Sequence, residues 1–233
     1  MTGRSVPVDE PAVLQGILSS TEALFLDFDG PVCSVFAGIP AHYVANQLRG
    51  VLSDGGHVDL PPEVEKTEDP FEVLRYAATL GEAEAIYVES ALTAHELEAV
   101  STAEPTNGAH TLIRAWHATG RASAIVSNNS QAAVSAYLNL HDLHDEIDVV
   151  VGRSTADPTT LKPSPHMINS ALRLTQAPSD RSTLIGDSAS DIVAATAAHV
   201  TAIGFANKTP KVDTLSGFHP ALVITQLPRL TAL

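Results

Sequence analysis

Two aspartates stand two positions apart at the end of a short apolar run. The run, Ala23–Phe28, carries Asp27 near its end, and Asp29 follows directly before Gly30. Two carboxylates this close repel each other unless a cation binds or one of them is protonated. Carboxylate oxygens are hard ligands of the kind that Mg²⁺ takes, usually one or two together with phosphate oxygens of a substrate. The pair therefore indicates a magnesium site that can meet a phosphorylated compound.

Other polar residues follow apolar runs in the same way. Asp187 follows one run and would bring a third carboxylate, while Ser127 closes another and can donate its hydroxyl to a phosphoryl oxygen. The main-chain N–H groups after Ser127 stand where a helix is expected to begin, which is a natural anion site. Lys162 supplies positive charge for the transferred group. With a metal to screen its charge, a carboxylate can act as a nucleophile toward a phosphate ester.

The elements that must position these residues alternate along the chain. Short apolar runs predict buried strands, and segments with apolar residues at helical spacing separate them. This alternation predicts a doubly wound parallel α/β sheet, in which ligands bind beyond the carboxyl ends of the strands. The expected strands are Ala23–Phe28, Ala122–Ser127, Ile147–Val151, Thr183–Gly186, Thr201–Phe205 and Leu222–Ile224, and the helices between them are His110–Ala118, Gln131–Leu140, Ser164–Leu174 and Asp191–Ala198.

One interval between strands is too long for a single crossover. About 90 residues separate the first strand from the second, where one βα unit takes about 30. Asp69-Pro70 is typical of a helix start and Gly81 of a helix end. We therefore predict a core domain of residues 1–34 and 104–233, with a small helical domain of residues 35–103 inserted above the first strand. Its expected helices are Ala41–Leu52, Pro70–Leu80 and Glu82–Thr102.

Composition restricts the partners of the chain. The 233 residues carry a net charge of −14, which repels nucleic acid and anionic membranes, so neither is expected as a partner. No apolar run reaches the ~20 residues of a membrane helix, and the N-terminus does not read as a secretory signal. We expect a cytoplasmic protein. Whether it is a monomer or a dimer is left open.

Several residues with reactive side chains are given an ordinary structural interpretation. Cys33 is the sole cysteine and is expected to be a small buried hydrophobe rather than a nucleophile. The histidines and acids at 141, 142, 144 and 145 are expected to form a solvated turn rather than a metal cluster. Arg49 and Arg75 lie in the inserted helices. Either of them could reach a distal group of a substrate or could simply face solvent.

Four segments in this order resemble the haloacid-dehalogenase-like hydrolase superfamily, over essentially the whole chain. They are Asp27-x-Asp29-Gly30, Ser127, Lys162-Pro163 and Gly186-Asp187-x3-Asp191. The resemblance is to the branch with a small helical (C1-type) cap after the first strand, which includes phosphoglycolate phosphatase-like and β-phosphoglucomutase-like proteins. It implies a Rossmann-like core with this cap, Mg²⁺ as cofactor and a small phosphorylated metabolite as substrate.

The resemblance also implies a role for each matching residue. Asp27 would be the nucleophile that becomes phosphorylated. Asp29 would protonate the leaving group and then activate water, while its main-chain carbonyl binds the metal. Asp187 would be a metal ligand, and Asp191 would support the metal shell or orient Lys162. The residues expected to hold the phosphoryl group are Ser127, Asn128 through its N–H, and Gly30.

Three other functions are compatible with parts of this pattern. A phosphomutase would use the same phospho-aspartate and pass the phosphoryl group to a second hydroxyl instead of water. A receiver-like signalling domain also places acids, a hydroxyl and a lysine around an aspartate, but it has no large insertion after its first strand. A non-catalytic ligand-binding protein would leave buried acids unused, which is costly. The second acid, Asp29, favours phosphoryl chemistry because the haloacid dehalogenases themselves lack it.

Overall fold

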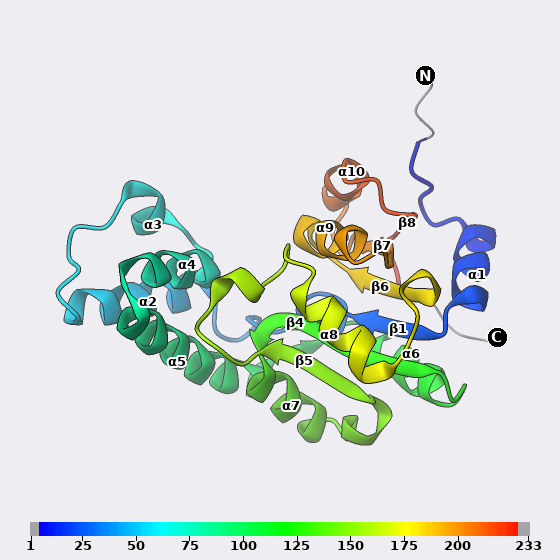
Figure 1. Cartoon of the computed structure of the whole chain (residues 1–233), viewed down its shortest axis with the longest axis horizontal. Coiled ribbons are helices and arrows are strands. Elements are labelled where there is room, and N and C mark those ends of the chain that lie inside the picture. The colour runs from blue at the N-terminus through cyan, green and yellow to red at the C-terminus, as the bar shows by residue number, and fades with distance from the viewer. Residues whose placement is uncertain (1–4, 228–233) are drawn as a thin grey trace.

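The computed structural model describes residues 5–227 of the chain. A six-stranded parallel sheet lies at its centre, with the strand order β5-β4-β1-β6-β7-β8 (Figure 1). The chain goes from β1 to one side and later returns to the other, so the order reverses beside β1, where ligands of such sheets bind. The strands are β1 (Ala23–Leu26), β4 (Ala122–Ser130), β5 (Val149–Arg153), β6 (Ser182–Gly186), β7 (Thr201–Phe205) and β8 (Leu222–Ile224).

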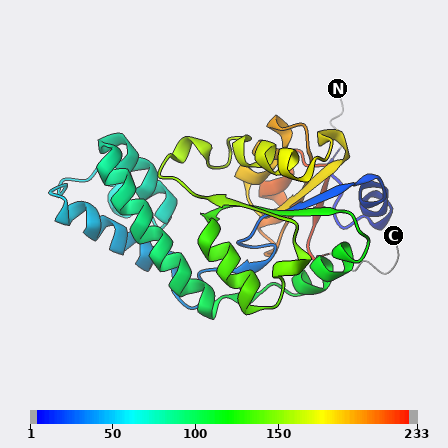
Figure 2. The ribbon, with the colours of Figure 1, turned by 60° about the horizontal axis from the view of Figure 1, so that its bottom comes forward.

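Helices cover both faces of the sheet, because alternate strand residues point to opposite faces. Leu24 and Leu26 pack with the helices of one face, whereas Phe25 packs with those of the other. Figure 2 shows α7 under the sheet and α8 over it. The first face is covered by α1 (Pro11–Ser20), α6 (Ala109–His117) and α7 (Gln131–Leu140), and the second by α8 (His166–Thr175), α9 (Ala189–Ala197) and α10 (Lys211–Ser216).

A helical unit lies beside the carboxyl ends of the strands (Figure 1). Three of its helices pack on one another through buried residues such as Val44, Leu74 and Leu92. The Asp69 side chain accepts a hydrogen bond from the N–H of Phe71 at 2.8 Å and so caps the next helix, as its sequence predicted. The helices are α2 (Ala41–Asp54), α3 (Pro62–Lys66), α4 (Pro70–Leu80) and α5 (Glu82–Ala99).

Helix α5 belongs to the helical unit and also reaches the sheet. It packs on α2 and α4, and it also contacts α7 and β4 (Figure 2). A short 3₁₀ turn, Val100–Thr102, and a two-residue strand, β3 (Glu104–Pro105), return the chain to the core. β3 pairs in antiparallel fashion with β2 (Cys33–Ser34), so entry and exit of the inserted segment lie side by side.

The elements agree with the sequence prediction in type and order, with differences at their ends. β4 runs on to Ser130 and β5 begins two residues late, at Val149. Helix α1 was not predicted. The short helices α3 and α10 and the β2–β3 pair were not predicted either, because short elements are held by packing rather than by their own periodicity. The domain boundaries remain a prediction.

Candidate active site

Three carboxylates meet at the carboxyl edge of the sheet. Oxygen atoms of Asp27, Asp187 and Asp191 lie within 4.8 Å of one another, and we call these three residues the carboxylate cluster. Asp27 follows β1, Asp187 follows β6, and Asp191 lies in the first turn of α9. Neighbouring parallel strands end at the same edge, which is why residues 160 positions apart in the chain become neighbours. The structure thus brings together the acids that the sequence placed after separate strands.

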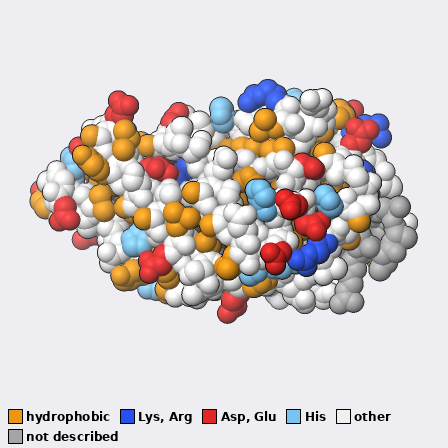
Figure 3. Space-filling view, turned by 90° about the horizontal axis from the view of Figure 1, so that it is seen from below, with side chains coloured by type: hydrophobic (Ala, Val, Ile, Leu, Met, Phe, Trp, Pro, Cys, Tyr) orange, Lys and Arg blue, Asp and Glu red, His pale blue; other side chains and the backbone are white. Residues whose placement is uncertain are grey.

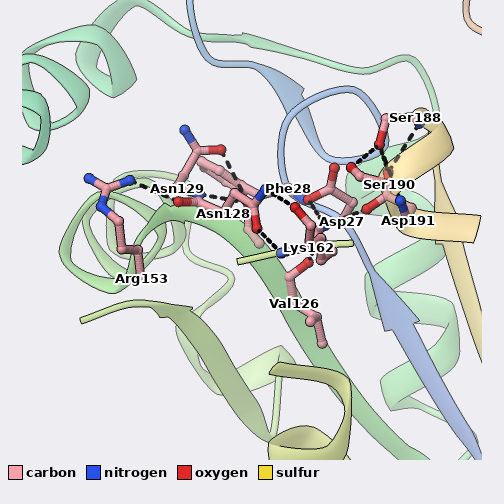
Figure 4. Close-up of polar contacts among 11 residues, drawn as sticks. Asp27, Phe28, Val126, Asn128, Asn129, Arg153, Lys162, Ser188, Ser190 and Asp191 are labelled. Atoms are coloured by element: carbon pink, nitrogen blue, oxygen red, sulfur yellow. Dashed lines mark hydrogen bonds and ion pairs between the residues drawn. The ribbon is translucent and has the colours of Figure 1, made fainter. Parts of the chain in front are cut away.

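Lys162 is the cation that pairs with two of the three carboxylates, those of Asp27 and Asp191. Its ammonium Nζ lies 2.8 Å from Asp27 Oδ1, contacts Asp191 Oδ1 and donates to the Val126 carbonyl at 2.9 Å (Figure 4). The side chain is almost fully buried. Burial alone would lower the pKa of Lys162, but the carboxylates of Asp191 and Asp27 outweigh it and raise the pKa. The lysine is therefore held charged against the two acids.

Asp191 is fixed from the other side by the start of its own helix. Ser188 accepts from the Asp191 N–H, and Asp191 Oδ2 accepts from the Ser188 N–H at 3.0 Å and from its hydroxyl at 2.6 Å. This is a reciprocal capping box. Asp191 therefore has one oxygen on Lys162 and the other on its helix start, which fits the predicted role of orienting the lysine.

The acids of the site are buried without enough positive charge to neutralise them all. Burial, with the nearby charges of Asp191 and Asp187, raises the pKa of Asp27 from 3.8 to about 8, against the opposing effect of Lys162. Burial also raises the pKa of Asp29 to about 6. The pKa of Asp187 is raised too, again chiefly by burial. Such raised values mark a site where a further cation would be bound favourably.

Asp29 and Gly30 shape the turn after β1. Asp29 Oδ1 accepts from the Val35 N–H at 3.0 Å, and Asp29 lines the same cavity as Asp27. Gly30 has a φ of +104°, and a Cβ there would stand 2.3 Å from Asp187 Cγ. Only glycine leaves room for that carboxylate. The N–H of Gly30 donates to the Cys33 carbonyl at 2.7 Å, so its predicted phosphate contact remains a prediction.

Asp187 has cationic and amide neighbours of its own. Lys211, on α10, contacts Asp187 Oδ2 and donates to the Asp187 carbonyl at 3.1 Å. Asn207 also donates to Asp187 Oδ2, at 3.3 Å. Sequence reasoning missed Lys211, because 24 residues separate it from Asp187 and no motif contains it. In this arrangement the Lys211 ammonium group occupies Asp187 Oδ2, an oxygen that a metal ion could also bind.

The segment Ser127–Ser130 lies on the other side of Lys162. The Asn128 side chain makes two hydrogen bonds to the main chain of Lys162. It accepts from the Lys162 N–H at 2.8 Å and donates to the Lys162 carbonyl at 3.2 Å. Ser127 Oγ donates to Asn129 Oδ1 at 3.1 Å and accepts from the Asn129 N–H at 3.2 Å. Ser127 and Asn128, both predicted to hold phosphate, therefore line the cavity with Asp27.

A cavity of about 190 Å³ connects the carboxylate cluster with the helical unit. Its far wall is made by Asp69, Phe71 and Arg75, around the start of α4. Arg75 is half-buried and pairs with Glu72 at 2.8 Å. Arg49 does not line this cavity, since its guanidinium donates to main-chain carbonyls within the helical unit. Of the two arginines considered from sequence, the structure brings Arg75 to the site.

A second buried charged group, which the sequence did not reveal, adjoins the site. Arg153 ends β5 and forms ion pairs with Glu89, at 3.1 Å, and with Glu96, at 2.9 Å, both on α5. We call these three residues the guanidinium cluster. Arg153 stands two residues beyond the predicted strand Ile147–Val151, and that position was the available signal. Glu96 stands within a helix and gave none.

The other reactive residues lie away from this edge or in ordinary surroundings. Cys33 is fully buried in the core, as predicted, and burial raises the pKa of its thiol. His144, Asp142 and Asp145 are exposed, in agreement with the expected solvated turn. His141 differs: it is half-buried, and its ring packs against that of Tyr137 on α7, with the ring centroids 4.2 Å apart and the planes tilted by 45°.

The donor set of the site fits a hard divalent cation. Carboxylate oxygens from Asp27, Asp187 and Asp191 converge, and carboxylates with room for phosphate oxygens are what Mg²⁺ prefers. Elsewhere, acidic side chains are spread over the face shown in Figure 3, and Lys and Arg are few on it. Within residues 5–227, no helix is long and apolar enough to cross a bilayer.

Comparison with known proteins agrees with the geometry. A family model described as haloacid dehalogenase-like hydrolase matches residues 68–205, which is more than half of the chain. No curated protein matches the chain. The matched residues contain the segments of Ser127, Lys162 and Asp187.

Solved structures with the same fold cover most of the chain at low sequence identity. One is CbbY from Rhodobacter sphaeroides in complex with phosphate, 19% identical, with a TM-score of 0.66 over 91% of this chain and 97% of that one. A predicted phosphatase from Clostridium acetobutylicum is 17% identical, with a TM-score of 0.65 over 88% and 93%. A predicted phosphoglycolate phosphatase from Haemophilus somnus is 17% identical, with a TM-score of 0.61 over 89% and 95%.

Proposed function

The chain belongs to the haloacid dehalogenase-like hydrolase family, and from that premise we propose that it is a Mg²⁺-dependent phosphatase acting through phosphorylation of Asp27. One observation carries the proposal: three carboxylates from separate elements converge beside the Ser127–Ser130 segment, and two of them pair with Lys162. A buried group of acids with one lysine is poorly suited to bind an apolar ligand. It is well suited to bind a cation and a phosphate ester together.

In the first half-reaction an Asp27 oxygen attacks the phosphorus atom of the ester. The bond between phosphorus and the leaving oxygen breaks, and an aspartyl phosphate forms on Asp27. Asp29, whose pKa near 6 leaves part of it protonated at neutral pH, gives its proton to the departing oxygen. The leaving group then departs as a neutral alcohol. Both acids line the same cavity, so one substrate can meet both.

In the second half-reaction water takes the place of the alcohol. Asp29, now ionised, accepts a proton from the water, which attacks the phosphorus atom and releases Asp27 as a free carboxylate. Lys162 holds Asp27 in place and offsets the negative charge of the transferred group. The hydroxyl of Ser127 and the N–H of Asn128 donate to the phosphoryl oxygens.

The ion proposed for the site is Mg²⁺ held by Asp27, Asp187 and the main-chain carbonyl of Asp29, with Asp191 supporting it. When bound, it supplies positive charge that favours the ionised form of Asp27 and screens it from the phosphate ester. That contribution opposes the effect of burial, which raises the pKa of Asp27.

Residues 35–103 are proposed to act as a cap that selects the leaving group. Asp69, Phe71 and Arg75 line the side of the cavity opposite Asp27, and a volume of about 190 Å³ suits a small metabolite. Arg75 would meet a polar or anionic end of the leaving group. Arg75→Ala should therefore raise KM about tenfold for a substrate with a second anionic group, and leave KM for an aryl phosphate nearly unchanged.

The test is phosphate release by the purified protein. We expect slow hydrolysis of a generic aryl phosphate with MgCl₂ and none after treatment with EDTA, and faster hydrolysis of one member of a panel of small phosphorylated metabolites. Analysis of the products separates hydrolysis from isomerisation of the substrate. Activity that persists in EDTA would refute the proposal, and so would an absence of phosphate release from the whole panel with MgCl₂.

A further inference from the structure

Arg153 is a buried side chain whose hydrogen bonds converge on one segment of the site. It is 2% exposed and makes five hydrogen bonds of 2.8–3.1 Å. Two go to the carboxylate of Glu96 as a bidentate pair, and one goes to the main-chain carbonyl of Asn128. A bidentate guanidinium–carboxylate pair fixes orientation as well as charge. Arg153 therefore holds the Asn128 main chain directly (Figure 4).

Glu96 holds the same segment from the opposite side. Its carboxylate accepts from the N–H of Ser130 at 2.9 Å and from the side-chain amide of Asn129 at 3.1 Å. Glu96 is fully buried, so these bonds form out of contact with water. Three consecutive residues after Ser127 are thus tied to one ion pair. Ser127 itself is linked to it through its bonds with Asn129.

The ion pair also connects this segment with the helical unit. Glu89 and Glu96 both lie on α5, which packs against α2 and α4. The Arg153 guanidinium lies over the Phe71 ring at 5.8 Å, and Phe71 lines the cavity opposite Asp27. One guanidinium group therefore contacts both the proposed phosphate-binding segment and the proposed cap wall.

From these contacts we infer that Arg153 and Glu96 are positioning residues, which set the Ser127–Ser130 segment for phosphoryl binding and join it to the helical unit. Neither side chain lines the cavity with Asp27, so both act through the segment that they hold. The inference rests on the proposed function, because it assigns these residues to the same site. Misplacing a binding group by about 1 Å can lower a rate about 100-fold even when the changed residue is remote.

The decisive variant removes both charges together. Arg153→Met alone leaves Glu96 buried without its partner, which destabilises the fold whatever its role. Arg153→Met/Glu96→Leu leaves no fully buried lone charge and keeps similar volume, so it should retain the fold. Glu89 loses Arg153 as its partner, but its side chain is 18% exposed and still accepts from the Thr93 hydroxyl at 2.8 Å. It still removes the acceptor of the Ser130 N–H and the donor to Asn128. We expect the double variant to unfold near the wild-type temperature and to bind inorganic phosphate at least about tenfold more weakly, by calorimetry with MgCl₂.

Arg121→Met is the matched control. Arg121 precedes the opposite end of β4, donates to the Leu18 and Thr21 carbonyls at 2.8 and 3.0 Å and stacks on Trp116. Its loss should lower stability and leave phosphate affinity unchanged. Arg153→Lys keeps the positive charge but loses the planar guanidinium that binds Glu96 through two hydrogen bonds. Its affinity for phosphate should lie between those of the wild type and the double variant. A folded double variant that binds phosphate as tightly as the wild type would overturn the inference.

A second measurement keeps this inference distinct from the proposed function. Amide hydrogen exchange at Ser130 in the ligand-free protein should become at least about tenfold faster in the double variant, because its N–H loses the Glu96 acceptor. Unchanged exchange at Ser130 would overturn the inference even if the enzyme proves to be a phosphatase. If the wild type binds no phosphate while exchange changes as expected, the proposed function fails and the structural tie remains.

Discussion

Two clusters of charged side chains lie at one edge of the sheet, and they differ in how their acids are held: one cluster lines a cavity, and the other has its polar atoms hydrogen-bonded to neighbouring elements. In the carboxylate cluster, two of the three acids pair with Lys162 and the third with Lys211, and burial raises the pKa of Asp27 to about 8. In the guanidinium cluster, Arg153 makes five hydrogen bonds. Three go to the carboxylates of Glu89 and Glu96, and the other two go to a main-chain carbonyl and a hydroxyl. Acids that line a cavity and have raised pKa values are prepared for a ligand that brings positive charge, whereas a cluster whose polar atoms are hydrogen-bonded holds neighbouring segments in place.

The largest effect expected from this comparison is on activity. Asp27→Asn should lower kcat by at least about 10³-fold, because it removes the proposed nucleophile while preserving the shape of the side chain. Phosphate release from an aryl phosphate measures it, and the exposed Asp213→Asn is the control. Turnover near the wild-type rate in Asp27→Asn would show that the carboxylate cluster does not supply the nucleophile.

Asp29→Asn should have the next largest effect. Its loss should slow both the formation and the hydrolysis of the aspartyl phosphate, by about 10²-fold or more, because one group serves as acid and then as base. Rapid-quench measurements of the two steps give each rate separately. A change confined to one step would show that Asp29 acts only as acid or only as base.

The variant that should lose the most activity, Asp27→Asn, should be more stable than the wild type at high pH. Because the folded pKa of Asp27 is raised above 3.8, the folded state binds more protons than the unfolded state between about pH 4 and pH 8. Proton binding by Asp27 therefore contributes to the free energy of unfolding below pH 4, and this contribution is lost as the pH rises toward 8. Asp27→Asn should therefore raise the Tm of the metal-free protein at pH 8, by about 2–4 °C per kcal/mol relieved, and much less at pH 4.5.

Glu96→Gln provides the comparison for that measurement. It neutralises the buried acid that pairs with Arg153 in the guanidinium cluster, so the Tm at pH 8 should fall by several degrees rather than rise. Thermal unfolding followed by circular dichroism in EDTA gives both values. If the Tm of both variants shifts in the same direction, burial of the acid does not have opposite effects on stability in the two clusters.

The smallest expected effect concerns the contact between Lys211 and Asp187. A divalent ion at Asp187 has to displace the Lys211 ammonium group from the carboxylate. Lys211→Met should therefore tighten Mg²⁺ binding about two- to fivefold, which corresponds to about 0.5–1 kcal/mol. Calorimetric titration with MgCl₂ measures it, with Lys208→Met as control. Weaker binding in Lys211→Met would show instead that the lysine holds Asp187 in its ligating position.

Local sequence determined much of this protein. Apolar runs bounded by polar residues gave the six strands of the sheet, and the rule that ligands bind beyond parallel strands pointed to Asp27, Ser127 and Asp187. The helix start at Asp69 was also predicted, because a capping aspartate followed by proline acts within a single turn. These features depend on near neighbours in the chain, and for that reason the sequence reveals them.

Only the tertiary structure decided which distant residues meet. Arg153 and Glu96 are 57 positions apart, and Lys211 and Asp187 are 24 apart. Neither pair shares an element or a motif. Their contact depends on how α5 and α10 pack against the sheet, and that packing depends on apolar surface rather than on the charged residues themselves. Which cation pairs with which acid is decided only when the strands and helices pack at this edge of the sheet. The sequence therefore pointed to the acids Asp27 and Asp187 but not to the partners of Asp187 and Glu96.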